Sequence, residues 1–394
     1  MKESDSTTLL LRNARLVLPE KIAEQASLLI LGDRIERIFE SSTPNISADS
    51  EIDLNGFTLF PGFIDVHIHG AVGFDLMDAT AASLNRISGF LATRGVTSWL
   101  PTLVPATVEK YNQAIGAIDD FAKVNSSGAR ILGVHYEGPF VNTLQCGALH
   151  ASDFRSFSKG KELDDLPRLN APNVCHLMTV APEVDGGIEL VRALSGSGWI
   201  VSIGHTRADF ATLDQALAAG ARHMTHFMNA MAPLHHRAPG PVAWGLARDE
   251  VTCDLIADGV HLNPDTLRLL LKLKGADSLS LISDAIAAAG MGDGEYEIWG
   301  ETITVKDGRT SNSHGSIAGS VITMLDAVRL MFSLDASESE IALMASTNPA
   351  TLLGIDDDCG SIEEGKRADL VALDKDGKVR LTLIGGKAAF LGVR

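Results

Sequence analysis

Between residues 60 and 283, short apolar stretches of β type alternate with stretches of helical periodicity, and this alternation constrains the fold most. The β-type stretches lie near residues 60–69, 96–101, 130–136, 174–181, 199–204, 222–227, 251–257 and 278–283. Helical patterns separate most of them, for example at 106–124, 207–220 and 263–273. Eight β/α units in roughly 290 residues favour a (β/α)8 TIM-type barrel, an α/β fold, over an open doubly wound sheet. No Gly-x-Gly-x-x-Gly follows the first strand, which counts against a dinucleotide-binding fold.

The two ends of the chain have a different sequence pattern. Residues 7–60 contain short β-type runs separated by turn signals, and the tail repeats this pattern at 368–374 and 379–386. We therefore expect one small β-sandwich domain built from both chain termini. The predicted limits are 1–60 and 356–394 for the two parts of the small domain and 61–355 for the barrel.

The formal net charge of −17 disfavours binding to nucleic acid or to an anionic membrane. An anionic substrate would need locally concentrated positive groups. No apolar run approaches the roughly 18 residues of a membrane span, and residues 1–6 do not resemble a secretory leader, so we expect a cytoplasmic protein. The four cysteines form no Cys-x-x-Cys pair, which argues for reduced thiols and against a thiolate zinc site.

Several predicted strands end in residues that can bind metals. His67 and His69 lie two residues apart at the end of the first strand, so both imidazoles face the same side. The other strand-end residues are His135 and Glu137 on the third strand, His205 on the fifth, His226 on the sixth and Asp284 on the eighth. In a TIM barrel these ends meet at the face that carries the active site. The sequence therefore predicts one cluster.

Imidazole and carboxylate ligands without a thiolate suit zinc, iron or another divalent first-row metal with an open position for water. Glu137 can ligate such a metal or take a proton, and a solvated loop glutamate is the alternative. A lone histidine at the position of His205 would more often be a core residue. His226, at the end of the next predicted strand, supports the assignment of His205 as a metal ligand. Asp284 beside a bound water can act as a general base, or it can cap a helix. His223 faces the other side of its strand from His226, so we interpret it as structural.

The chain resembles the amidohydrolase superfamily and, within it, the N-acetylglucosamine-6-phosphate deacetylase family. The motifs that carry the resemblance are Pro61-Gly-Phe-Ile-Asp-Val-His-Ile-His-Gly, His135-Tyr-Glu-Gly-Pro-Phe, Ala181-Pro-Glu, Gly204-His-Thr, Thr225-His-Phe-Met-Asn-Ala-Met, Ala257-Asp-Gly-Val-His, Ser283-Asp-Ala, Gly315-Ser-Ile-Ala-Gly-Ser and Gly360-Ser-Ile-Glu-Glu-Gly-Lys-Arg-Ala-Asp-Leu-Val. They span almost the whole chain. The resemblance implies hydrolysis of the acetamide of N-acetylglucosamine 6-phosphate to acetate and glucosamine 6-phosphate.

The resemblance also implies roles for individual residues. Glu137, His205 and His226 would hold the principal metal, zinc first and iron, cobalt or manganese otherwise. Asp284 would be the catalytic acid and base, and His67 with His69 would accommodate a second ion. A further group would bind the phosphosugar, namely His261, Asn229, Ala230 and Arg237, the last in its own or a neighbouring subunit's site of a homodimer. For Arg237 an ordinary surface charge is the alternative.

One position departs from the family pattern. A substrate-contacting histidine usually follows Gly-Ala in the loop after the third strand, but here the loop is Cys146-Gly-Ala-Leu-His-Ala-Ser. Leu149 takes the expected position and His150 comes one residue late. The implied role of His150, polarisation of the acetamide carbonyl, depends on the shape of this loop.

Two other functions remain open. The first is an amidohydrolase that acts on another N-acyl or cyclic amide substrate. Cyclic-amide hydrolases of the superfamily often bridge two metals with a carboxylated lysine on the fourth strand, and residues 174–182 contain no lysine. The second is a non-catalytic barrel that binds a partner. The metal content of the purified protein would distinguish this alternative from either enzyme.

Overall fold

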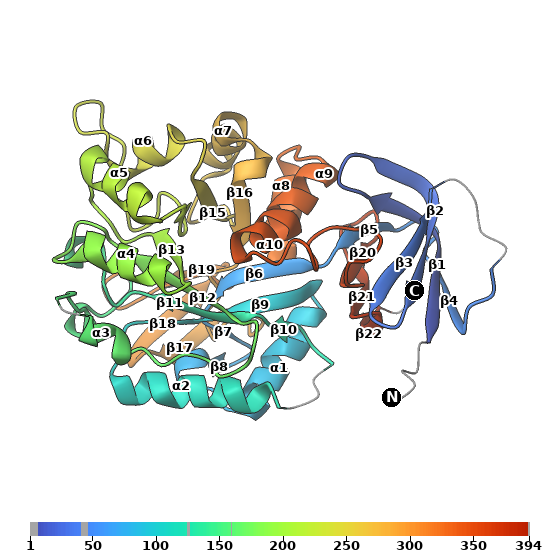
Figure 1. The fold of residues 1–394 in the computed structure, drawn as a ribbon, viewed down its shortest axis with the longest axis horizontal. Helices are drawn as coiled ribbons and strands as arrows, with labels where there is room; N and C mark the ends of the chain where they lie inside the picture. Colours follow the sequence, from blue (N-terminus) through green and yellow to red (C-terminus); the bar gives the residue numbers. More distant parts are fainter. Residues whose placement is uncertain (1–6, 41–45, 124–126, 159, 393–394) are drawn as a thin grey trace.

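The computed structural model describes residues 7–40, 46–123, 127–158 and 160–392. Eight parallel strands form a nearly closed barrel, as predicted, and a separate sheet lies beside it (Figure 1). The barrel strands follow one another in space in chain order. They are β6 (Phe63–Ile68), β9 (Val96–Leu103), β11 (Gly133–Glu137), β12 (Cys175–Val180), β13 (Ile200–Ile203), β14 (His223–Met224), β15 (Thr252–Ile256) and β16 (Leu279–Ile282). A short strand, β10 (Arg130–Ile131), pairs with β9 outside this series.

The barrel closes between β6 and β16 through single contacts instead of a regular ladder. Ile68 and Ala285 form an isolated parallel bridge. The Asp284 N–H donates to the His67 carbonyl at 2.9 Å, and the His69 N–H donates to the Ala285 carbonyl at 2.8 Å. This seam places the two histidines of the first strand directly beside the aspartate that follows the last strand.

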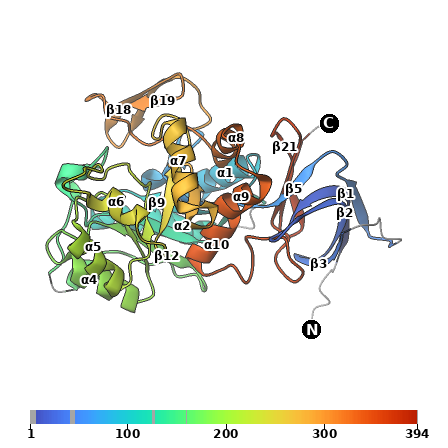
Figure 2. The same cartoon turned by 90° about the horizontal axis from the view of Figure 1, so that it is seen from above.

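Helices surround the barrel strands (Figure 2). They are α1 (Ala81–Ala92), α2 (Val108–Phe121), α3 (Lys161–Asp164), α4 (Gly187–Gly196), α5 (Phe210–Ala219), α6 (Gly240–Leu246), α7 (Pro264–Lys274), α8 (Met324–Ser333), α9 (Glu338–Ala342) and α10 (Asn348–Leu353). The predicted helices at 106–124, 207–220 and 263–273 correspond to α2, α5 and α7; residue 124 lies outside the described residues. Side chains cap each of the three at its start: Thr107, Asp209 and Asn263. In the described part of the chain, no helix is long and apolar enough to cross a membrane.

Strands from both ends of the chain form the separate sheet, as predicted. They are β1 (Thr8–Val17), β2 (Ile22–Leu31), β3 (Arg34–Phe39), β4 (Ser50–Asp53), β5 (Thr58–Pro61), β20 (Leu370–Leu373), β21 (Val379–Ile384) and β22 (Lys387–Leu391). Antiparallel pairing of β5 with β20, for example Leu59 opposite Ala372, joins the two ends. The domain limits 1–60, 61–355 and 356–394 stay a prediction, and residues 1–6, 41–45 and 393–394 lie outside the described residues.

A small antiparallel sheet follows the last barrel strand and has no counterpart among the predicted elements. It comprises β17 (Gly294–Ile298), β18 (Glu301–Lys306) and β19 (Arg309–Ser311), and its β18 and β19 project beside the barrel in Figure 2. Trp299 and Gly300 turn from β17 to β18 with φ of 54° and 79°. Positive φ at both residues is typical of the tight hairpin turn that matches strand twist. Buried Ile298 and Ile303 anchor the sheet to the rest of the chain.

Candidate metal centre

The metal-type residues lie at the carboxyl ends of the barrel strands. Glu137 is the last residue of β11, and His69 directly follows β6. His205, His226 and Asp284 each come two residues after their strands, β13, β14 and β16, with φ of 48°, 32° and 50°. This left-handed region is uncommon for residues other than glycine, and clusters of such residues occur at functional sites. The turn out of the strand aims all three side chains into one space.

Glu137, His205 and His226 form a buried group of potential ligands. The Nε2 atoms of His205 and His226 each lie 2.9 Å from Glu137 Oε1 and 3.1 Å from one another. Three side chains from three different strands thus direct their ligand atoms at one point. These are the three residues predicted for the principal metal.

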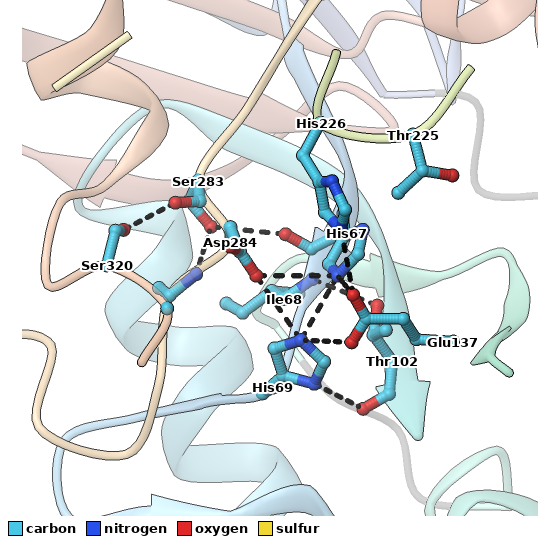
Figure 3. A network of polar contacts seen from close by, with 12 residues as sticks. His67, Ile68, His69, Thr102, Glu137, Thr225, His226, Ser283, Asp284 and Ser320 are labelled. Atoms are coloured by element: carbon cyan, nitrogen blue, oxygen red, sulfur yellow. Dashed lines mark hydrogen bonds and ion pairs between the residues drawn. The ribbon is translucent and has the colours of Figure 1, made fainter. Parts of the chain in front are cut away.

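His67, His69 and Glu137 form a second buried group that shares the same carboxylate. The Nε2 atoms of the two histidines are 3.1 Å apart, and His69 Nε2 lies 3.3 Å from Glu137 Oε2. Figure 3 shows the two rings and Glu137 turned toward one another. Glu137 therefore stands between the two groups, as a carboxylate shared by two ions would.

Backbone carbonyls fix the tautomers of two of these histidines. A carbonyl oxygen only accepts hydrogen bonds, so the His205 Nδ1–H must donate to Gln145 O at 2.7 Å. His69 Nδ1 has the same relation to Thr102 O at 3.2 Å. When the rings are neutral, each Nε2 then presents a lone pair to the cluster, the arrangement typical of metal-binding histidines.

The charges of the cluster favour a cation at its centre. Burial opposes ionisation of Glu137, but the facing His67, His205 and His226 outweigh it and hold the pKa of this carboxyl well below its usual range. Burial likewise opposes a proton on His69, yet Asp284 and Glu137 raise its pKa to about 10. In the absence of an ion, a proton on His69 thus balances the carboxylates. A divalent metal would supply this positive charge instead, and the nitrogen and oxygen ligands fit zinc, iron, cobalt or manganese.

Asp284 lies beside both groups of ligands. Its Oδ1 is 3.4 Å from His67 Nε2 and 3.3 Å from His69 Nε2, and the side chain is almost fully buried (Figure 3). Burial opposes its ionisation, but His67 and His69 lower its pKa below the usual value. The carboxylate is therefore ionised and can accept a proton from a water held in the cluster.

The ligand atoms open into a cavity of about 310 Å³. Asn229, Ala230 and His261, three of the predicted substrate-binding residues, line it. The Asn229 N–H donates to the His226 carbonyl at 2.9 Å, which fixes this segment beside a metal ligand. His261 Nδ1 lies 2.6 Å from Asp258 Oδ2, so its ring is held in place by a carboxylate.

Two predicted substrate-binding residues lie outside this cavity. Leu149 lines it, whereas His150 lines a neighbouring cavity and has its Nε2 3.2 Å from Glu301 Oε1. Arg237 is exposed, and its guanidinium contacts His236. The chain as a monomer therefore does not bring either side chain to the metal cluster.

His135 and His223 are held by partners inside the barrel. His135 lies deeper than Glu137, with Nδ1 3.0 Å from the Val66 carbonyl and Nε2 2.8 Å from Thr179 Oγ1. Since both its ring nitrogens are engaged in this way, the ring is not available as a ligand. His223, which we interpreted as structural, lies 2.6 Å from Thr252 Oγ1 and 2.9 Å from Asp254 Oδ1.

Sequence reasoning missed two residues of the site. Trp299, in the unpredicted β17–β18 turn, lines the cavity with its ring centroid 5.3 Å from that of His69. Glu183 binds the loops on either side of His205 through Asn142, Thr206 and Arg207. The motif Ala181-Pro-Glu marked Glu183 in the sequence, but no pattern indicated its partners.

Comparisons with known proteins give a matching family and several relatives. A sequence model of the amidohydrolase family matches residues 58–389. N-acetylglucosamine-6-phosphate deacetylase of Bacillus subtilis is 40% identical over 342 residues, 84% of this chain and 85% of the relative. N-acetylgalactosamine-6-phosphate deacetylase of Escherichia coli O157:H7 is 34% identical over 383 residues, 97% and 99% of the two chains. A solved mutant of the Mycobacterium smegmatis N-acetyl-D-glucosamine-6-phosphate deacetylase, in complex with N-acetyl-D-glucosamine-6-phosphate, superimposes with a TM-score of 0.87 at 30% identity, covering 98% of this chain and 100% of that one.

Proposed function

The chain belongs to the amidohydrolase family, and from this membership we propose that it hydrolyses the acetamide of N-acetylglucosamine 6-phosphate to acetate and glucosamine 6-phosphate. One observation carries the proposal: the Glu137, His205 and His226 group lies beside ionised Asp284 in a cavity also lined by Asn229, Ala230 and His261. A hydrolytic centre and polar groups for a small substrate thus share one cavity. The relatives supply the identity of the sugar phosphate.

The residues of the cluster have distinct tasks in this reaction. A divalent ion bound by Glu137, His205 and His226 would acidify water and polarise the acyl carbonyl. Asp284 Oδ1 takes a proton from the attacking water as the new C–O bond forms. It returns that proton to the amine nitrogen as the C–N bond breaks.

The phosphate needs positive charge in a protein of net charge −17. The residues that line the cavity in the described part of the chain include no lysine or arginine. We propose that His261 and the Asn229-Ala230 segment contact the sugar phosphate, and that Arg237 completes the site of a neighbouring subunit in a homodimer. Sedimentation of the purified protein tests the second statement, and a monomer at working concentration would contradict it.

Zinc as the native metal and a cytoplasmic location are also part of the proposal. The all-nitrogen-and-oxygen ligand set suits zinc, and iron, cobalt and manganese share this preference. The four free cysteines favour the cytoplasm, where thiols stay reduced. Metal analysis of protein purified without chelators tests the first statement, and cell fractionation tests the second.

The E. coli relative raises a second candidate substrate, N-acetylgalactosamine 6-phosphate. The two sugars differ only in the configuration at C4, far from the scissile amide. Cyclic amides are less favoured, because β12 (Cys175–Val180) contains no lysine that could bridge two metals. Relative kcat/KM values for the two phosphosugars distinguish the first two candidates.

The test is acetate release from N-acetylglucosamine 6-phosphate beside unphosphorylated N-acetylglucosamine, with divalent metal supplied. We expect a strong preference for the phosphorylated sugar, because the phosphate adds charged contacts that the free sugar lacks. His261→Asn should weaken that preference, whereas His314→Asn, an exposed histidine outside the cavity, should not. Equal rates for the two sugars would contradict the assignment.

A further inference from the structure

A second cavity of about 400 Å³ adjoins the metal cavity. The two cavities share three lining residues, Ala148, Leu149 and Trp299. The other residues of the second cavity are Asp75, Met77, Asp78, Val104, Pro105, Ala106, Thr107, Lys110, His150, Asp153, Glu297, Ile298 and Gly300. The mechanism above uses none of these, so the space has no assigned occupant.

Of the three shared residues, Leu149 and Trp299 have the large side chains, and we call these two side chains the wall. Leu149 is 7% exposed, and its N–H donates to the Cys146 carbonyl at 2.9 Å, which fixes the loop behind it. The Trp299 ring meets the His69 ring edge to face, with centroids 5.3 Å apart and planes at 86°. Trp299 therefore stands immediately beside His69, one of the residues of the cluster.

The direction of the acyl group follows from the geometry of an amide. A trans amide carries its two carbon substituents on opposite sides of the C–N bond. Asn229 and Ala230 lie on the His226 side of the cluster, and Trp299 lies on the His69 side. Figure 3 shows His226 and His69 on opposite sides, with His67 between them. If the sugar occupies the first side, as the proposed function requires, the acyl group faces the wall.

We propose that Leu149 and Trp299 determine the acyl specificity of the enzyme, because together they stop the acyl group after acetyl and separate it from the second cavity. An apolar wall suits a methyl group. This inference rests on the proposed function and adds to it the selectivity of the enzyme for the acyl group.

The chemistry of the second cavity limits what a trimmed wall would admit. Four carboxylates line it, Asp75, Asp78, Asp153 and Glu297. Lys110 is ion-paired with Asp78, and His150 lies beside Glu301. The space behind the wall therefore favours a neutral acyl chain and repels one that ends in a carboxylate.

The test compares N-acetyl, N-butyryl and N-succinyl glucosamine 6-phosphate as substrates. For the unmodified enzyme we expect kcat/KM for the butyryl compound to be about tenfold or more below that for the acetyl compound, because the wall leaves no space for the added methylene groups. Leu149→Ala should raise the butyryl-to-acetyl ratio by about tenfold, because the chain can then enter the second cavity. Leu144→Ala, on the same loop but 73% exposed and outside both cavities, is the matched control and should leave the ratio unchanged.

Trp299→Leu provides a second opening of the wall if Leu149→Ala does not fold. An unchanged ratio in folded variants would overturn the proposal, and so would equal acetyl and butyryl turnover by the unmodified enzyme. An equal gain for the succinyl compound would also overturn it, because the acyl chain would then not enter the acidic cavity behind the wall. The proposed function is tested separately, because it predicts turnover of the acetyl compound by the unmodified enzyme whatever the ratios are.

Discussion

At the scale of single residues, the site depends on side chains that leave their strands in an unusual backbone conformation. His205, His226 and Asp284 all have positive φ two residues past a strand end. Such conformations cost free energy and persist where the surrounding structure enforces them. For Asp284, the Ser320 N–H donates to the backbone carbonyl at 2.8 Å, and this contact helps to hold the turn.

Asp284→Asn should lower kcat for deacetylation by about 10²-fold to 10⁴-fold, because an amide of the same size cannot take up the proton of the attacking water. Metal bound by Glu137, His205 and His226 should remain. Steady-state kinetics and metal analysis of the same preparation check both statements. The control is Asp265→Asn, whose side chain is 88% exposed. Near-normal kcat in the first variant would mean that another group moves the proton.

The sequence predicted these residues because strand-end positions follow from a period of two and from short apolar runs. It could not separate His135 from the ligands, since depth in the barrel depends on the register of neighbouring strands. It could not place the side chains of Leu149 and His150 either, because these residues are neighbours in a loop, whose shape no periodic pattern encodes. Trp299 carried no signal, because its hairpin was not predicted.

At the scale of elements, the loops after β11 and β13 hold His205 in place together. Glu183 accepts hydrogen bonds from Asn142 Nδ2 at 2.8 Å and from Thr206 Oγ1 at 2.6 Å, one from each loop. The Asn142 N–H in turn donates to the His205 carbonyl at 3.1 Å. Glu183 thus helps to position His205 without contacting the cluster itself.

Glu183→Gln should weaken metal binding by about tenfold, because its amide oxygen can still accept from Asn142 and Arg207 but its amide nitrogen cannot accept from the Thr206 hydroxyl. Competition with a chromophoric zinc chelator measures this affinity independently of catalysis. The matched control is Glu189→Gln on α4, where the side chain is exposed. Unchanged affinity together with a lower melting temperature would mean that Glu183 is only structural.

Elements with a clear period were predictable from the sequence, and irregular ones were not. The helical patterns that gave α5 and α7 carry both an apolar face and an N-cap residue. Strand β14 is only two residues long, yet the β-type stretch at 222–227 predicted it. In the sheet β17–β19, strand β17 (Gly294–Ile298) is buried only at Ile298, whereas β18 does alternate, with Ile303 and Val305 buried, and this signal was missed.

At the scale of the whole molecule, the barrel and the terminal sheet are joined by buried polar contacts. Arg130 of β10 lies 2.6 Å from Asp369, which precedes β20, and Thr382 of β21 donates to the Ala92 carbonyl at 2.8 Å. The alternation of strands and helices predicted the barrel. The short β-type runs and turn signals at both ends of the chain predicted their common sheet. The irregular seam between β6 and β16 could not be predicted, because its backbone contacts join residues far apart in the sequence and form no regular ladder.

The central claim is that the strand-end cluster is a metal centre that hydrolyses an amide. The most direct measurement is a titration of chelator-stripped protein with zinc, following bound metal and acetate release from N-acetylglucosamine 6-phosphate together. We expect no turnover without metal and an increase in proportion to the ion bound by Glu137, His205 and His226. Undiminished turnover by the fully stripped protein would contradict the account.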